Sequence, residues 1–210
     1  MIIAIDGPTA AGKGTLARLL AKDLGYAYLD SGALYRAVAL ALLRSGQDVT
    51  DARVAAKAAQ TLDPELLSDP GLRDEATGVA ASRISVFPEV RAALLDYQRD
   101  FAAHPPQDAK GAVLDGRDIG TVICPAAKVK FFVTASPEVR AKRRFLELVA
   151  KGETVKIEQI LADLKARDAR DAGREEAPLR PAADAYLLDT SDLAIDAALA
   201  VAKAYILAKA

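Results

Sequence analysis

Short apolar runs alternate with helical patterns along the chain. Residues 2–6 form a short run that is rich in β-branched side chains and apolar up to Asp6, and Gly7-Pro8 ends it, as is typical of a strand buried on both faces. Leucines at helical spacing over residues 13–24 predict a helix that Gly25 stops. The alternation indicates an α/β fold with a five-stranded parallel, doubly wound sheet flanked by helices. The remaining strands are predicted at 27–29, 112–114, 129–133 and 185–188, and a second helix at about 33–44 with Ser31 or Gly32 as its cap.

Two segments are predicted to lie outside this sheet. Between Gly46 and His104 the pattern is helical and is broken at prolines, which indicates a helical insertion at one edge of the sheet. Helices are also predicted over about 137–150 and 156–174, separated by Lys151-Gly152-Glu153. These two helices would together form a mobile flap.

Composition and charge exclude several classes of protein. The 210 residues are 51% hydrophobic and 27% charged, which is ordinary for a folded globular chain. The chain has 28 Lys+Arg against 29 Asp+Glu, and a net charge of -1 argues against a general binder of nucleic acid or membrane surfaces. Cys124 is the single cysteine, which excludes an intramolecular disulfide and a cysteine-based zinc site. No signal peptide and no apolar span of the ~20 residues that a bilayer requires are apparent, so cytoplasm is the expected location.

A glycine-rich loop follows the first predicted strand and opens the first helix, as a phosphate-binding loop (P-loop) does. Its glycines would let backbone N–H groups wrap a polyphosphate, and Lys13 would reach the terminal phosphates. In the strict P-loop pattern Ser or Thr follows the lysine directly, whereas here Gly14 separates Lys13 from Thr15. The Thr15 hydroxyl is therefore expected to hold Mg²⁺ either directly or through water. A nucleoside triphosphate would therefore bind residues Gly7, Pro8, Thr9, Ala10, Ala11, Gly12, Lys13, Gly14 and Thr15.

Polar residues follow two further predicted strands, at the edge where open α/β sheets bind ligands. Asp115-Gly116-Arg117-Asp118 comes after the third strand, and Ser31 and Arg36 come after the second. Phosphoryl transfer needs positioning and charge neutralisation more than covalent chemistry, and arginine binds phosphate oxygens with two N–H groups at once. These positions suit the phosphates of a second substrate.

The two flap helices carry further arginines. Ile160, Leu164, Arg167, Asp171 and Arg174 fall on one helical stripe, which is apolar first and charged afterwards. Burying the charged end against a core would be costly, so it is expected to line a polar cleft or contact an anion, with a fully solvated helix as the alternative. On the preceding helix, one face carries three residues that would reach the triphosphate when the flap closes, with a solvated face as the alternative: Arg140, Arg143 and Arg144.

The P-loop leaves several classes of nucleotide-binding protein to compare. A guanine-nucleotide switch needs an Asn-Lys-x-Asp element, and the chain contains no asparagine. A motor or transporter ATPase normally has more than 210 residues. A regulatory module that uses ATP only as a conformational ligand would not need the second anion site indicated by Arg36, Arg117 and Arg174. A small-molecule kinase is the interpretation that uses all of these residues.

Five stretches together resemble one known family. Read in chain order, IDGPTAAGKGTLA, LDSGALYR, AASRISVFPEVRAAL, LDGRDIGTVICP and RDARDAGREEAPLRPAADAYLLDTS are similar to the bacterial cytidylate kinases, a family of nucleoside monophosphate kinases. LDGRDIGTV and the RDxRDxxR pattern distinguish this family from adenylate kinases, which share the P-loop. The resemblance spans most of the chain.

This resemblance implies a P-loop kinase fold, a reaction and a division of the chain. ATP would phosphorylate CMP and dCMP to CDP and dCDP with Mg²⁺, in a monomer; a kinase for UMP or another small phosphate acceptor is the alternative. A single kinase domain is expected, with its core at about 1–35, 105–140 and 175–210, a monophosphate-binding insertion at about 36–104 and a lid at about 141–174. Many relatives carry a small antiparallel sheet in the insertion, but residues 62–75 are too few and too rich in Pro, Asp and Gly to contain it.

The resemblance also implies roles for individual residues. Lys13, Arg117, Arg143 and Arg174 would be catalytic. The acceptor phosphate would lie near Ser31, Arg36, Arg117 and Arg174, and the sugar near Tyr35, Arg167 and Asp171, with Asp115 also on the substrate side. Ser82, Arg91 and Asp118 would read cytosine, whose exocyclic amine donates to a carboxylate and whose ring atoms accept from Arg or Ser.

Overall fold

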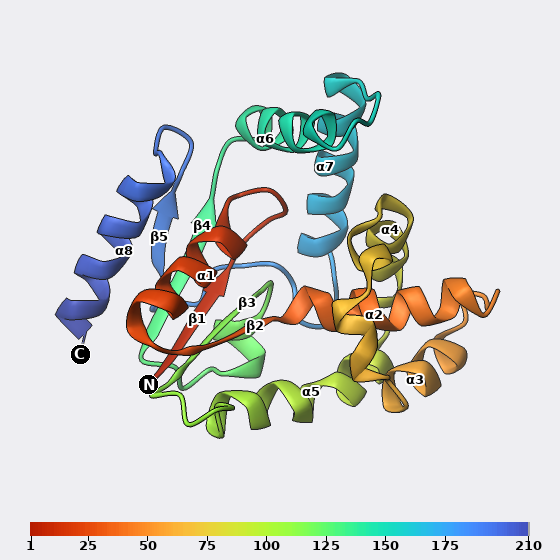
Figure 1. Cartoon of the computed structure of the whole chain (residues 1–210), viewed down its shortest axis with the longest axis horizontal. Helices are drawn as coiled ribbons and strands as arrows, with labels where there is room; N and C mark the ends of the chain where they lie inside the picture. The colour runs from red at the N-terminus through yellow and green to blue at the C-terminus, as the bar shows by residue number, and fades with distance from the viewer. Residues whose placement is uncertain (210) are drawn as a thin grey trace. The chain divides into compact units, whose positions relative to one another are not determined.

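The computed structural model describes residues 1–209 and contains one five-stranded sheet of order β2-β3-β1-β4-β5 (Figure 1). Central β1 pairs in parallel with β3 and β4, placing Ile3 opposite Val113 and Val129, and β4 pairs in parallel with β5. The parallel α/β sheet predicted from the sequence is confirmed. Its strands are β1 (Ile2–Asp6), β2 (Ala27–Asp30), β3 (Ala112–Gly116), β4 (Val129–Thr134) and β5 (Tyr186–Asp189).

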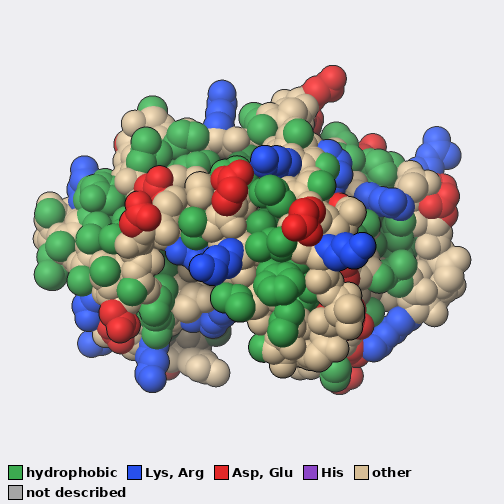
Figure 2. Space-filling model, turned by 90° about the horizontal axis from the view of Figure 1, so that it is seen from above, with side chains coloured by type: hydrophobic (Ala, Val, Ile, Leu, Met, Phe, Trp, Pro, Cys, Tyr) green, Lys and Arg blue, Asp and Glu red, His purple; other side chains and the backbone are tan. Residues whose placement is uncertain are grey.

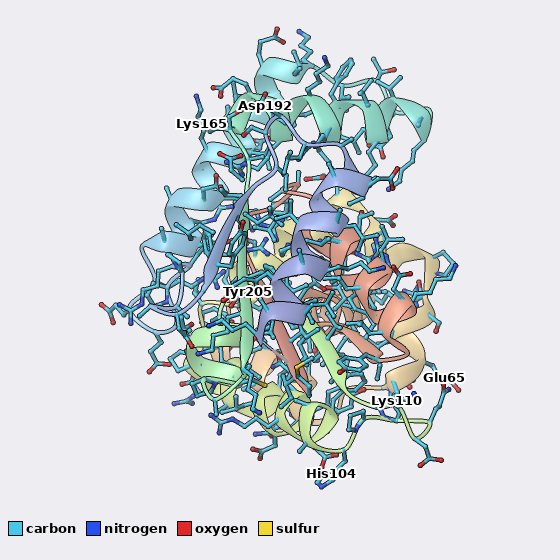
Figure 3. The ribbon with its side chains drawn as sticks, turned by 90° about the vertical axis from the view of Figure 1, so that its left-hand side faces the viewer. Glu65, His104, Lys110, Lys165, Asp192 and Tyr205 are labelled. Carbon is cyan, nitrogen blue, oxygen red and sulfur yellow. The ribbon has the colours of Figure 1, made fainter. Side chains whose placement is uncertain are left out.

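Helices α1 (Lys13–Leu24) and α8 (Ile195–Lys209) pack in one apolar cluster with the central strands. Helix α1 packs on β1 and β3 and against α8, and Figure 1 shows α8 running beside β5. The Tyr205 ring of α8, labelled in Figure 3, meets Phe131 of β4 edge-on with ring centroids 5.3 Å apart. Gly25 ends α1 with a φ of 65°, a left-handed conformation that glycine adopts without strain. The predicted bounds and stop of α1 are confirmed.

Helices α6 (Pro137–Ala150) and α7 (Ile157–Ala172) form a pair with an apolar cluster of their own. Ser136 caps α6 by accepting a hydrogen bond from the Val139 N–H at 3.3 Å. Ile160 and Leu164 bury the apolar part of the predicted α7 stripe. Helix α7 ends at Ala172, so Arg174 lies beyond the helix that was predicted to contain it.

The segment Leu29–Ala103 forms a compact unit that is helical after β2. Its core lies between α2, α3, α4 and α5, and includes Leu34, Leu42, Ile84 and Leu94. Within the described chain no strand occurs between 46 and 104, as predicted, and residues 64–73 form two short 3-10 helices in place of the small sheet. The bounds are α2 (Ser31–Arg44), α3 (Ala52–Gln60), η1 (Pro64–Ser68), η2 (Pro70–Arg73), α4 (Glu75–Ile84) and α5 (Pro88–Ala103).

The cap of α2 differs from the prediction. Ser31 and Gly32 lie inside the helix, and Asp30 is the cap, because its carboxylate accepts the Ala33 N–H at 3.1 Å. Asp30 also pairs with Arg73 at 2.9 Å. The last residue of β2 therefore caps α2 directly, with no intervening turn.

The other compact unit consists of Met1–Tyr28 and the described chain from His104 onward. It contains the P-loop, η3 (Ile119–Ile123, a single π turn) and the α6–α7 pair. The division of the chain into core, insertion and lid stays a prediction. No helix in residues 1–209 is both long and apolar enough to cross a membrane.

Candidate active site

The P-loop runs from the end of β1 into α1. A Cβ atom on Gly7 would lie 2.0 Å from the Val133 carbonyl oxygen, so only glycine fits against β4 there. Gly12 precedes α1 with a φ of 86°. No side chain within residues 1–209 caps α1, and its first turn holds no acidic residue. The N–H groups and positive dipole end of α1 therefore suit an anion, as predicted.

Lys13, the first residue of α1, is a neighbour of Asp115 near the carboxyl end of β3. The Lys13 Nζ lies 4.0 Å from the Asp115 Oδ2, and the Tyr28 hydroxyl donates to Asp115 Oδ1 at 2.8 Å. Asp115 is buried, and its Oδ2 lies 3.5 Å from where a Cβ on Gly14 would be. Asp115 and Gly116 belong to β3 itself, a correction to their expected place after the strand.

Arg117 joins the P-loop to the end of α7. Its Nε donates to Asp171 Oδ2 at 2.9 Å, and its Nη2 donates to the Thr9 hydroxyl at 2.6 Å. Arg174 Nη2 pairs with the other Asp171 oxygen. The charged end of the α7 stripe is thus paired and largely buried rather than solvated, which confirms the expected inward orientation.

The charge state of Asp171 follows from these arginines. Burial by itself raises the pKa of a carboxyl, but the positive charges of Arg117, Arg174 and Arg167 outweigh it and hold the Asp171 pKa below its ordinary value. Asp171 is only 1% exposed, and each of its carboxylate oxygens pairs with an arginine. The carboxylate fixes the arginines and offsets part of their charge.

Asp6 organises the chain that follows Arg117. Its carboxylate accepts the Ile119 N–H at 2.8 Å and the Gly120 N–H at 2.7 Å, holding the start of η3 against β1. Burial raises the Asp6 pKa to about 7 despite these hydrogen bonds, and nearby Asp118 adds to the increase. Asp118 is itself buried beside this turn, so the predicted base-reading carboxylate has a fixed place.

The three arginines of α6 have different partners. Arg140 is buried, pairs with Asp168 on α7 at 2.6 Å and donates to the Thr9 carbonyl at 3.2 Å, so it supports the P-loop backbone. Arg143 donates to the Thr190 hydroxyl at 2.9 Å and lies 3.9 Å from where a Cβ on Gly12 would be. Arg144 pairs with Glu147 on its own helix.

Several predicted residues belong to the unit Leu29–Ala103. Ser31 is buried in the first turn of α2, where Tyr35 and Arg36 follow it. The Arg91 guanidinium lies 5.9 Å from the centre of the Tyr35 ring, so these two predicted residues meet. Ser82 is 4% exposed, and its hydroxyl has no hydrogen-bond partner within the described residues. A joint site of these residues with Arg117 and Arg174 stays a prediction.

Comparison with known proteins gives the chain a family. The family model described as Cytidylate kinase matches residues 3–207. A cytidylate kinase of Rhodospirillum rubrum is 60% identical over 202 residues, covering 96% of this chain and 95% of that protein. The chain belongs to the cytidylate kinase family. A cytidylate kinase of Paramagnetospirillum magneticum is 58% identical over 201 residues, again covering 96% of this chain and 95% of that protein.

Among solved structures, the crystal structure of an uncharacterized protein from Eubacterium ventriosum aligns with this cytidylate kinase family member at a TM-score of 0.55 and 16% identity. The alignment covers 99% of this chain and 98% of that chain. At this identity the likeness concerns the fold alone, and it agrees with the parallel α/β sheet.

Sequence reasoning missed four residues that organise this cytidylate kinase site. Asp168 holds Arg140, and its place three residues before Asp171 was the available signal, because residues at that spacing share a helix face. Thr190 follows β5 and receives Arg143, so its position at the carboxyl end of a strand was the signal. Asp6, which ends β1, had the same signal. Tyr28 had none, because its hydroxyl reaches a partner 87 residues away.

The donor set of the site fits Mg²⁺ bound mainly by nucleotide. Mg²⁺ usually takes one or two protein oxygens and completes its shell with water and substrate phosphates. The Thr15 side chain is exposed in the first turn of α1, and the Asp115 carboxylate on β3 lies 3.5 Å from where a Cβ on neighbouring Gly14 would be. Within residues 1–209 no group of three metal-ligating side chains occurs. Thr15 and Asp115 are the residues that would hold the metal.

Proposed function

We propose that the protein transfers the γ-phosphoryl group of ATP to CMP or dCMP and so forms ADP with CDP or dCDP. The observation that carries the proposal is the cluster of Lys13, Arg117, Asp171 and Arg174 around a P-loop at the carboxyl edge of a parallel sheet. A relative that carries the name cytidylate kinase at 60% identity supports the choice of substrate.

The P-loop binds the donor in this proposal. The glycines let the backbone N–H groups approach the β- and γ-phosphates, and the end of α1 adds its dipole. Lys13, 4.0 Å from Asp115, neutralises charge on the transferring group, and Arg143 acts near Gly12. Mg²⁺, when bound by Thr15 directly or through water, supplies further neutralisation between the phosphates.

The acceptor phosphate is held by arginines. Arg117 and Arg174 are fixed by Asp171 before any substrate arrives, so little rotamer entropy is lost when an oxyanion binds. Ser31 and Arg36 complete the phosphate site in this proposal, and Tyr35, Arg167 and Asp171 contact the sugar. Transfer is in line and direct, with no covalent enzyme intermediate.

Cytosine recognition falls to Ser82, Arg91 and Asp118. The buried Ser82 hydroxyl, which no described residue satisfies, supports a ligand contact, because an unpaired buried hydroxyl costs roughly 1–3 kcal/mol. A carboxylate at Asp118 accepts from the cytosine amine, whereas uracil offers a carbonyl oxygen at the same position. In this proposal the three side chains therefore favour cytidine over uridine nucleotides.

We propose a monomer, in keeping with the resemblance of the sequence to the bacterial cytidylate kinases. Buried Cys124 and the absence of disulfides among residues 1–209 suit a reducing compartment such as the cytoplasm.

A coupled assay of ADP production with a panel of monophosphates tests the function. CMP and dCMP are expected to support rapid ADP release, with UMP slower and AMP close to the background without acceptor. A single buried polar mismatch discriminates by on the order of 10²-fold or more, which sets the expected margin over AMP. Equal rates with all four acceptors, or ADP release that needs no acceptor, would contradict the proposal.

A further inference from the structure

Thr9 is bonded at two different atoms by two different arginines. Its hydroxyl accepts from Arg117 Nη2 at 2.6 Å, and its carbonyl oxygen accepts from Arg140 Nη1 at 3.2 Å. Neighbouring Ala10 has a φ of 62°, a strained value for a residue with a side chain, so the loop needs outside support at this point. The two bonds fix both the backbone and the side chain of one P-loop residue.

Both arginines are held in turn by one face of α7. Asp168 pairs with Arg140 through both carboxylate oxygens, at 3.2 and 2.6 Å, and Asp171 accepts from Arg117 Nε at 2.9 Å. Asp168 and Asp171 stand three residues apart, so they lie on the same side of the helix. Arg140 also donates to the Ala135 carbonyl at 3.0 Å, which ties it to the end of β4.

The bonds to Arg117 leave part of its guanidinium for a ligand. Nε donates to Asp171, Nη1 to the Gly116 carbonyl at 3.2 Å, and Nη2 to Thr9. Of five N–H groups, three are used, and within residues 1–209 one N–H on each terminal nitrogen has no partner. A pair of N–H groups on the two terminal nitrogens matches two oxygens of a phosphate.

From this arrangement we infer that the Thr9 hydroxyl is a positioning group that sets the orientation of Arg117 toward the acceptor phosphate. This role rests on the proposed function and assigns the Thr9 side chain to the acceptor side of the reaction, although its backbone belongs to the donor loop. Without the hydroxyl, the Nη2 group loses its fixed partner and the guanidinium gains freedom that acceptor binding must remove. Removing the hydroxyl therefore weakens binding of the acceptor more than binding of ATP.

Thr9→Val and Thr9→Ser form the matched pair for the test. Valine keeps the shape and removes the hydroxyl, whereas serine keeps the hydroxyl and removes a methyl group. Calorimetric titration with CMP and with a non-hydrolysable ATP analogue gives the two dissociation constants. Thr9→Val is expected to raise the CMP Kd by about tenfold, the scale of one hydrogen bond to a charged group, and the analogue Kd by less than about threefold. Thr9→Ser is expected to restore most of the CMP affinity.

A double-mutant cycle with Arg117→Ala separates positioning from general damage to the loop. If the hydroxyl acts through Arg117, adding Thr9→Val to Arg117→Ala causes no further loss of CMP affinity. The inference is overturned if Thr9→Val raises both dissociation constants equally, if Thr9→Ser is as impaired as Thr9→Val, or if Thr9→Val keeps its full effect in the Arg117→Ala background. Failure of the unmodified protein to phosphorylate CMP would instead overturn the proposed function.

Discussion

At the scale of single residues, two buried carboxylates in the same unit have opposite electrostatic settings. Asp171 sits among Arg117, Arg174 and Arg167, and their charges keep its pKa low although burial opposes them. Asp6 accepts two backbone N–H bonds, but burial dominates and raises its pKa to about 7. At Asp171 the charges of the arginines thus outweigh the effect of burial on the pKa. At Asp6 the two backbone N–H groups do not outweigh it.

The raised pKa of Asp6 predicts a pH dependence of folding. The native state binds the Asp6 proton more tightly than the unfolded chain, whose carboxyl has a pKa near 3.8. The free energy of unfolding therefore falls as pH rises from about 4 to about 7, by roughly 1 kcal/mol per pH unit at most, and this contribution levels off above pH 7.

Urea denaturation of the unmodified protein and of Asp6→Asn at several pH values measures this contribution. Asparagine does not titrate, so the difference in unfolding free energy between the two proteins isolates Asp6 from the other carboxylates. Between pH 5 and 7, the unfolding free energy of the unmodified protein is expected to fall relative to that of Asp6→Asn. Parallel curves across this range would show that Asp6 ionises normally.

At the scale of secondary-structure elements, the start of α2 depends on the carboxylate of Asp30. Asp30→Ala is expected to lower the free energy of unfolding by about 1–2 kcal/mol, because the Ala33 N–H loses its acceptor. Asp30→Asn keeps a capping oxygen and gives up the charge that pairs with exposed Arg73, an interaction worth about 0–1 kcal/mol. Denaturant titration of both variants checks that Asp30→Ala loses more unfolding free energy than Asp30→Asn. Equal losses would show that the ion pair, not the cap, stabilises α2.

The elements themselves could largely be predicted from the hydrophobic pattern. Buried parallel strands are continuous apolar runs and α1 ends at a glycine, so residues 2–6 and 13–24 were predicted with their observed bounds. The cap of α2 was predicted wrongly because Asp30 also ends β2, and no local pattern says whether such a residue belongs to the strand or to the helix. The end of α7 at Ala172 was missed because the charged stripe continues past the last helical turn.

At the scale of the whole molecule, contacts distant in sequence set the limit of prediction. Thr9 and Arg117 are 108 residues apart, and Arg140 and the Thr9 carbonyl are 131 apart. Motif spacing placed Thr9 and Arg117 at the carboxyl edge of the sheet and Arg140 on a flap helix, but it could not pair particular donors with particular acceptors. The sequence therefore named Thr9 and Arg117 as candidate site residues, while the hydrogen bond between them required the fold.

The central claim is direct transfer of phosphate from ATP to CMP over the P-loop. Its most direct test follows ATP labelled at the γ-phosphorus through a reaction with CMP and Mg²⁺, using the unmodified protein, Lys13→Ala and, as a control on the same helix, Lys22→Ala at an exposed position. The label is expected in the β-phosphate of CDP, at a rate that Lys13→Ala lowers by about 10²–10³-fold and Lys22→Ala leaves nearly unchanged. Label released as inorganic phosphate with CMP unchanged, or a near-normal rate in Lys13→Ala, would contradict the account.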